Sequence, residues 1–122
     1  MLKKSSTEKL TTALALPTTG QEQDWDAELA DPSRIREFLH AYQVLSLTPD
    51  DRVALMALIM ASVELHLSAG SDVSHDWERI AAILRQERDL HRETISYWAC
   101  EGEDDPEACF FLTPMVRRVD AE

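Results

Sequence analysis

The residues of this chain that could carry out chemistry are four histidines, two cysteines and two acidic stretches. A histidine or a pair of carboxylates can act as a general acid or base, and clusters of His, Cys, Asp and Glu can bind metal ions. The spacing favours neither role, because no HxxxH, HExxH or Cys/His cluster is present. Gly20, Gly70 and Gly102 lie too far apart for a phosphate-binding loop. The sequence therefore predicts a protein that is not an enzyme and has no metal site or cofactor.

His91 is the histidine that allows two interpretations. It falls on an apolar helical stripe between Leu84 and Ile95. In a pocket it could serve as a base or a partner contact, and the protein would then be a minor enzyme. At a helix interface it would be a neutral histidine, hydrogen-bonded to Arg88 or to a backbone carbonyl. We favour the structural role, because the stripe calls for an uncharged group at this position.

The strongest feature of the sequence is its acidity. The net charge is −11 over 122 residues, and residues 22–31 and 101–107 contain carboxylates but no base. Negative charge speeds the approach of a basic protein and repels nucleic acid, while aromatic side chains can anchor a complex. The candidate partner-binding residues are Trp98, Glu101, Glu103, Asp104, Asp105, Glu107 and Phe111. A secondary set is Asp24, Trp25, Asp26 and Glu28. The alternative is that both stretches only confer solubility, with Trp98 in the core.

The two cysteines, Cys100 and Cys109, bracket the second acidic stretch. A hairpin could bring them together, so a disulfide is one alternative. We expect two reduced thiols instead, because a chain of this length folds without a disulfide scaffold.

Start signals and apolar periodicity predict an all-α fold. Helices are expected over residues 6–16, 32–46, 49–67 and 75–100, with a short extended segment at 109–112 and a closing turn over 113–119. The helix over 49–67 is apolar on nearly every side and should be central. Short connections favour an antiparallel bundle of three main helices, with a peripheral N-terminal helix and a C-terminal closing segment.

The N-terminal region is expected to be peripheral. Residues 1–23 read as an arm with a short helix, opened by a Ser5–Glu8 capping box, and residues 24–122 as one helical domain. Glu8 and Lys9 interrupt the apolar start, so it is a poor signal peptide. No apolar run is long enough for a membrane span. We therefore expect a cytoplasmic protein that does not contact a membrane.

Four segments together resemble the small immunity proteins encoded beside polymorphic or contact-delivered bacterial toxins. They are LTPDDRVALMALIMASVEL, the helix ending in ISYW, the acidic loop and FFLTPMVRR, and the resemblance covers about residues 31–119. The chain is also similar to colicin nuclease immunity proteins, which are acidic helical bundles. The resemblance implies an inhibitor that occludes a basic toxin domain, a nuclease for example, with carboxylates in place of phosphates. The alternative is a small helical adaptor or chaperone that binds a partner helix.

Overall fold

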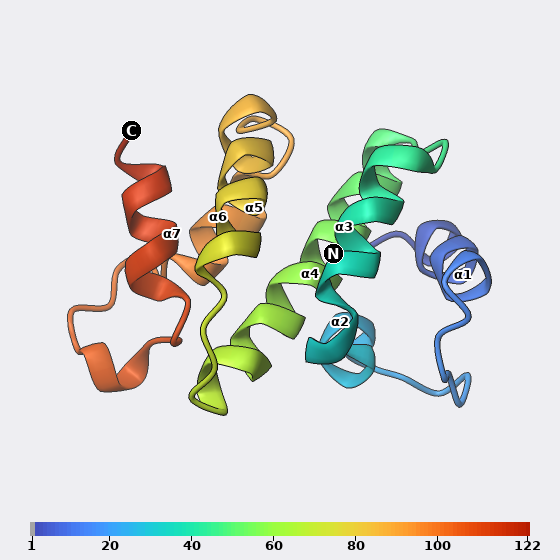
Figure 1. Ribbon diagram of the computed structural model, residues 1–122, viewed down its shortest axis with the longest axis horizontal. Coiled ribbons are helices and arrows are strands. Elements are labelled where there is room, and N and C mark those ends of the chain that lie inside the picture. The colour runs from blue at the N-terminus through green and yellow to red at the C-terminus, as the bar shows by residue number, and fades with distance from the viewer. Residues whose placement is uncertain (1) are drawn as a thin grey trace.

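The computed structural model describes residues 2–122, and this part of the chain is helical without a β-strand, which confirms the all-α prediction (Figure 1). The α-helices are α1 (Lys4–Ala13), α2 (Trp25–Leu29), α3 (Ile35–Val44), α4 (Pro49–Ser68), α5 (Ser74–Gln86), α6 (Arg92–Trp98) and α7 (Thr113–Asp120). Two 3-10 turns, η1 (Pro32–Arg34) and η2 (Pro106–Ala108), precede α3 and α7. Over residues 2–122 the helices are thus shorter and more numerous than the predicted three main helices.

Helix α4 lies between the N-terminal helices α1–α3 and the C-terminal helices α5–α7 (Figure 1). It begins with a capping box: the Thr48 hydroxyl accepts from Asp51 N at 3.2 Å, and the Asp51 carboxylate accepts from Thr48 N at 3.0 Å. Every residue from 54 to 63 is buried. A helix that is apolar all round must be covered on every side, so its neighbours fold around it. The prediction that this helix is central is confirmed.

Helix α1 packs against α4 instead of projecting as an arm. Leu10, Leu14 and Leu16 are buried in the same core as the rest of the chain. The predicted Ser5–Glu8 capping box is absent, because the helix begins at Lys4 without a side-chain cap. Asp51 of α4 instead holds α1 through hydrogen bonds from side chains at residues 6 and 9.

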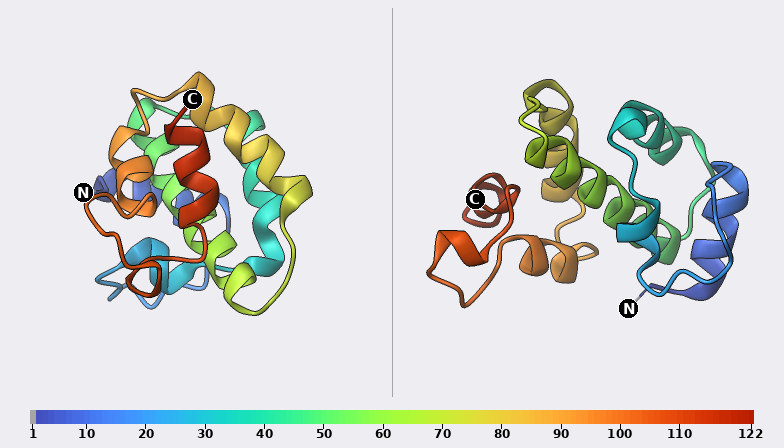
Figure 2. Two further views of the ribbon diagram at one scale, coloured as in Figure 1. Left: turned by 90° about the vertical axis from the view of Figure 1, so that its left-hand side faces the viewer. Right: turned by 90° about the horizontal axis from the view of Figure 1, so that it is seen from below.

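The predicted helix over residues 75–100 is wrong in one respect, because residues 87–91 form a turn that separates α5 from α6. At this turn Glu87 lies beside the Tyr42 hydroxyl of α3 and bonds to Arg52 of α4, with an Arg52 Nη1–Glu87 Oε2 distance of 3.1 Å. The helix is therefore interrupted at the point where the Glu87 side chain contacts α3 and α4. After the turn, α6 lies at an angle to α5 (Figure 2) and contains Tyr97 and Trp98 in its last turn.

The C-terminal segment closes the core without a strand. Residues 109–112, predicted to be extended, form bends and turns, because backbone N–H groups of Phe111 and Leu112 donate to the Glu64 carboxylate at 2.9 and 2.8 Å. Leu112, Val116 and Val119 are then buried against the rest of the fold. The predicted closing turn is a full helix, α7.

Candidate binding surface

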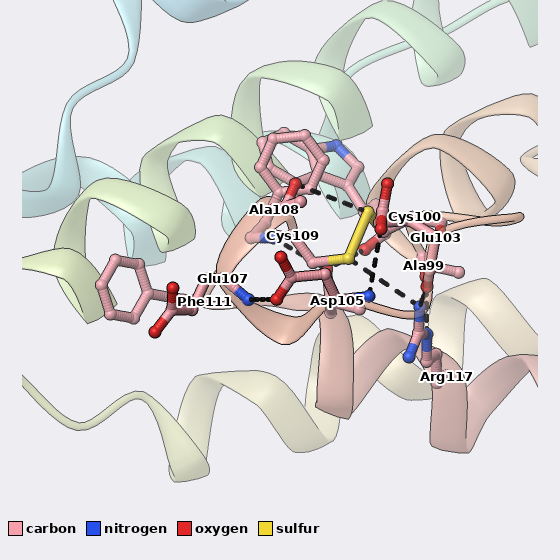
Figure 3. The surroundings of a disulfide bond; sticks show 12 residues. Ala99, Cys100, Glu103, Asp105, Glu107, Ala108, Cys109, Phe111 and Arg117 are labelled. Atoms are coloured by element: carbon pink, nitrogen blue, oxygen red, sulfur yellow. Dashed lines mark hydrogen bonds between the residues drawn. A yellow bond between two sulfur atoms is a disulfide. The ribbon is translucent and has the colours of Figure 1, made fainter.

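The loop between α6 and α7 is closed by a disulfide between Cys100 and Cys109, so the expectation of two reduced thiols is wrong (Figure 3). The chain reverses at Cys100 and Gly102, whose φ angles are +57° and +84°. This reversal brings the two cysteine Cα atoms to 5.8 Å, within the range that a disulfide spans. The bond turns the acidic stretch into a closed loop, all of whose residues from 101 to 108 are exposed.

Arg117 of α7 holds this loop in place (Figure 3). Its guanidinium donates to the carbonyl oxygens of Ala99 at 2.8 Å, Cys100 at 3.2 Å and Glu103 at 2.9 Å. The planar donor group thus fixes backbone at both ends of the chain reversal. Asp105 accepts from Glu107 N at 3.0 Å and so caps η2. The backbone from which the loop carboxylates project is therefore held in place.

Some of the loop carboxylates are hydrogen-bonded within the protein and others are not. Glu101 accepts from the Ser96 hydroxyl at 2.6 Å, and Glu103 accepts from Asp105 N at 3.0 Å. Over residues 2–122, the side chains of Asp104 and Glu107 take part in no hydrogen bond or ion pair. These two are therefore the carboxylates most available to a partner.

The aromatic side chains around the loop divide into core and surface. Trp98 is only 7 % exposed and packs on Phe110 with ring centroids 4.5 Å apart, so it belongs largely to the core. Phe111 is 61 % exposed and points away from the disulfide (Figure 3). Tyr97 was not among the partner-binding residues predicted from the sequence, and its side chain is 60 % exposed.

The secondary acidic stretch lies mainly on α2. Asp24 immediately precedes the helix, and its backbone N–H donates to Glu28 at 2.7 Å, which fixes the first turn. The Trp25 indole N–H donates to the Thr11 hydroxyl of α1 at 3.0 Å and is half-buried. Asp26 is also half-buried. Helix α2 was not predicted, because its five residues are too few to show apolar periodicity.

A cleft of about 620 Å³ separates this stretch from α6. One wall carries Glu22, Asp24, Trp25 and Asp26; the other carries Glu93, Tyr97 and Trp98. Val53 and Ala57 of α4 form part of the floor. A shallower hollow beside Cys100 and Glu101 shares Glu93 and Tyr97 with the cleft. Of the second acidic stretch, Glu101 is therefore the residue that lies next to the cleft, at this hollow.

Not every predicted site residue takes part in this cleft. Asp24, Trp25, Asp26 and Trp98 line it, and Glu101 lies at the adjoining hollow. Glu28, Glu103, Asp104, Asp105, Glu107 and Phe111 line neither. Glu22 and Glu93 also line the cleft but were not predicted as site residues. Glu22 belongs to the first acidic stretch and could have been included, whereas Glu93 lies on the polar face of a predicted helix and carried no such signal.

Hydrogen bonds and burial set the pKa values of the ionisable groups along the cleft. Hydrogen bonds from Thr18 and Thr19 lower the pKa of Glu22 to about 2, so this carboxylate is ionised at any ordinary pH. Burial raises the pKa of Asp26, and the charge of Asp24 adds to this increase. Burial and the charges of Asp26 and Asp24 also raise the pKa of Tyr97, since a phenolate there would face two carboxylates.

His91 lies inside the core, and its exposed fraction is 0 %. Its Nε2 is 2.9 Å from the Tyr42 hydroxyl and 3.3 Å from Glu87 Oε1, so its partners are neither Arg88 nor a backbone carbonyl. The Tyr42 hydroxyl donates to Glu87, which leaves its oxygen to accept from His91 Nε2–H. Within residues 2–122 the Nδ1 atom has no hydrogen-bond partner. Burial lowers the pKa of His91 and keeps the ring neutral.

We expect His91→Gln to lower the free energy of unfolding by about 1–2 kcal/mol through the loss of a buried hydrogen bond. Because the folded-state pKa lies below the usual 6.5, the unfolded chain binds a proton first as pH falls. Wild-type stability should therefore decline below about pH 6.5, and this part of the decline should vanish in the variant. Urea unfolding between pH 5 and 8 measures both effects, with exposed His40→Gln as the control. An unchanged pH profile would contradict this role.

Among residues 2–122, no three His, Cys, Asp or Glu side chains are grouped so that they could hold a metal ion. In the same part of the chain, none of the helices combines the length and the apolar character needed to cross a membrane.

Comparison with known proteins returned no relatives: no protein-family model, no curated protein and no solved structure matches this chain.

Proposed function

We propose that this protein is an inhibitor of the immunity-protein type, which binds a basic protein domain, such as that of a toxin nuclease, and occludes its active site. The observation that carries the proposal is the cleft beside α6, where Asp24, Asp26 and Glu93 lie near the exposed ring of Tyr97. The acidic loop of residues 101–108 follows the end of the same helix. Charge complementarity of this kind gives fast encounter and excludes acidic partners. The protein itself performs no reaction in this proposal.

The ordered loop suits inhibition better than a loose acidic tail would. The disulfide and Arg117 fix residues 101–108 before any partner arrives, so little conformational entropy is lost on binding. The carboxylates of Asp104 and Glu107 then lie free at the surface to meet lysine or arginine side chains.

The disulfide also bears on where the inhibitor would act. Disulfides persist in oxidising compartments and are rare in the cytoplasm. The closed loop therefore favours a partner met outside the reducing cytoplasm, in contrast to the cytoplasmic location expected from the N-terminal sequence.

The adaptor alternative rests on the apolar floor of the cleft, which could accept a partner helix. Affinity capture from an extract of the source organism, with the bound proteins identified by mass spectrometry, distinguishes the two. A single basic protein whose activity falls on binding supports inhibition. Several amphipathic partners without a common basic surface would contradict it.

We expect the double variant Asp104→Asn/Asp105→Asn to slow association with that purified basic partner by roughly threefold to tenfold at low salt. The reason is that steering by charge acts on the association rate and is screened over about 10 Å at 0.1 M salt. Association and dissociation rates at two salt concentrations give the measurement.

The matched control is Glu78→Gln/Asp120→Asn, which removes two exposed charges from α5 and the end of α7. Its association rate should stay closer to that of the wild type. If the loop variant associates as fast as this control and keeps the wild-type salt dependence, the acidic loop is not the docking surface.

A further inference from the structure

The cleft between α2 and α6 is large enough for a bound group. Its volume of about 620 Å³ lies within the range of about 300–1,000 Å³ found for sites that enclose small ligands. Helices α2 and α6 lie on either side of α4, so the two walls come from distant parts of the chain (Figure 2). The walls are rigid elements with buried faces, because Leu29 of α2 and Ile95 of α6 are core residues.

The charge inside the cleft is not balanced by the protein. Within residues 2–122, none of Asp24, Asp26 and Glu93 forms an ion pair. The one base on the lining, Lys4, is 89 % exposed at its side chain and lies 3.9 Å from Glu8. Burial raises the pKa of Asp26, and the neighbouring charge of Asp24 adds to this increase.

The aromatic side chains that line the cleft indicate which kind of cation it would bind. The Trp25 indole N–H is already bonded to Thr11, so this side chain offers its ring and no hydrogen-bond donor. Tyr97 on the other wall is 60 % exposed. A guanidinium group stacks on aromatic rings, is less strongly hydrated than an ammonium and donates to several carboxylate oxygens at once. Aromatic rings combined with several carboxylates therefore favour arginine over lysine.

We propose that this cleft receives an arginine side chain from a basic segment of the protein partner, with the guanidinium between Trp25 and Tyr97 and bound by Asp24, Asp26 and Glu93. This inference rests on the proposed function and adds to it a specific anchor. The acidic loop steers the partner, and the cleft retains it.

The test uses a capped pentapeptide, acetyl-Gly-Arg-Gly-Arg-Gly-amide, and two matched peptides with lysine or citrulline in place of arginine. Citrulline keeps the shape of arginine without its charge. The readout is the indole N–H signals of Trp25, Trp77 and Trp98 in two-dimensional NMR, assigned with single Trp→Phe variants. We expect the arginine peptide to shift the Trp25 signal and leave that of Trp77, on α5, in place.

The lysine peptide should bind more weakly, and the citrulline peptide should produce no shift. Asp24→Asn/Asp26→Asn should weaken arginine-peptide binding about tenfold or more, whereas Asp104→Asn/Asp105→Asn should leave it within about twofold at 0.15 M salt. An unchanged Trp77 signal shows that the cleft variant is folded. Glu93→Gln, on the opposite wall, provides a second variant if that signal does move.

Equal shifts with the citrulline peptide, or no shift of Trp25 with the arginine peptide, would overturn the inference. Free agmatine that binds as tightly as the peptide would also overturn it, since the cleft would then be a site for a small molecule. Failure here is separable from failure of the proposed function. Suppose that Asp104→Asn/Asp105→Asn slows association with the basic partner, whereas Asp24→Asn/Asp26→Asn binds that partner like the wild type. The arginine site in the cleft is then ruled out, and the proposed inhibitor function stands.

Discussion

Leu58→Asp is expected to unfold this protein. Leu58 lies in the middle of α4 with an exposed fraction of 0 %, surrounded by other fully buried side chains. An unpaired carboxylate at this position would lose its hydration without gaining a partner, which costs several kcal/mol. Small domains have a total stability of only about 5–15 kcal/mol, so this one change removes much or all of it.

Far-ultraviolet circular dichroism and urea unfolding give the measurement. Leu65→Asp is the matched control, because it makes the same exchange on the same helix at a side chain that is 44 % exposed. The control should unfold close to the wild type. A Leu58→Asp variant that stays folded and cooperative would mean that α4 is not the centre of the fold.

The second large effect is expected for Asp51→Asn. The Asp51 carboxylate accepts from Ser6 Oγ at 2.7 Å and from Lys9 Nζ at 2.6 Å, while it also completes the capping box of α4. The neutral side-chain amide of asparagine cannot form the ion pair with Lys9. Its NH2 group would also face hydrogen-bond donors that the carboxylate now accepts from. We expect a loss of about 2–3 kcal/mol from the buried hydrogen bonds and the cap. The Lys9 side chain is 45 % exposed, so water screens part of the ion pair and the loss stays moderate.

The pH dependence of this variant provides a second readout. Burial acts to raise the pKa of Asp51, but hydrogen bonds from Lys9, Ser6 and Thr48 outweigh it and lower the pKa below the usual 3.8. The stability that Asp51 contributes is therefore complete well above pH 3.8 and is lost as pH falls from there toward the folded-state pKa. The difference between wild type and variant should shrink over that interval. Asp50→Asn, the exposed neighbour in the same helical turn, is the control and should show no such change.

The sequence was informative wherever a local signal determines the structure. Thr48, Pro49 and Asp51 carry a complete helix start, and the continuous apolar run behind them requires burial, so both the start and the central place of α4 were predictable. Asp31 likewise caps the turn that precedes α3, accepting from Ser33 N at 2.9 Å, and Pro32 follows it directly. Such features need only residues a few positions apart.

The break between α5 and α6 depends on distant residues instead. No glycine or proline marks residues 87–91, and the turn is recognisable only when Glu87 meets Tyr42 and Arg52, which lie 45 and 35 positions away. The attachment of α1 has the same origin, because Ser6 and Lys9 contact a carboxylate more than 40 positions further along. Local periodicity cannot report such contacts.

The candidate site was predictable in its composition but not in its geometry. The acidic stretches and their aromatic neighbours were visible in the sequence. The cleft was not visible, because it combines α2, α4 and α6, and the position of α6 depends on the unpredicted turn at 87–91. Trp98 was expected at the docking surface, but packing against Phe110 places it largely in the core.

The disulfide has a consequence for how the protein matures. With only two cysteines, the chain has a single intramolecular pairing, so oxidative folding cannot scramble bonds and has no need of a disulfide isomerase. The oxidation state of one molecule is therefore all-or-none. Alkylation of free thiols on protein taken directly from cells, followed by intact mass, reads that state and reveals the redox compartment in which the chain folded.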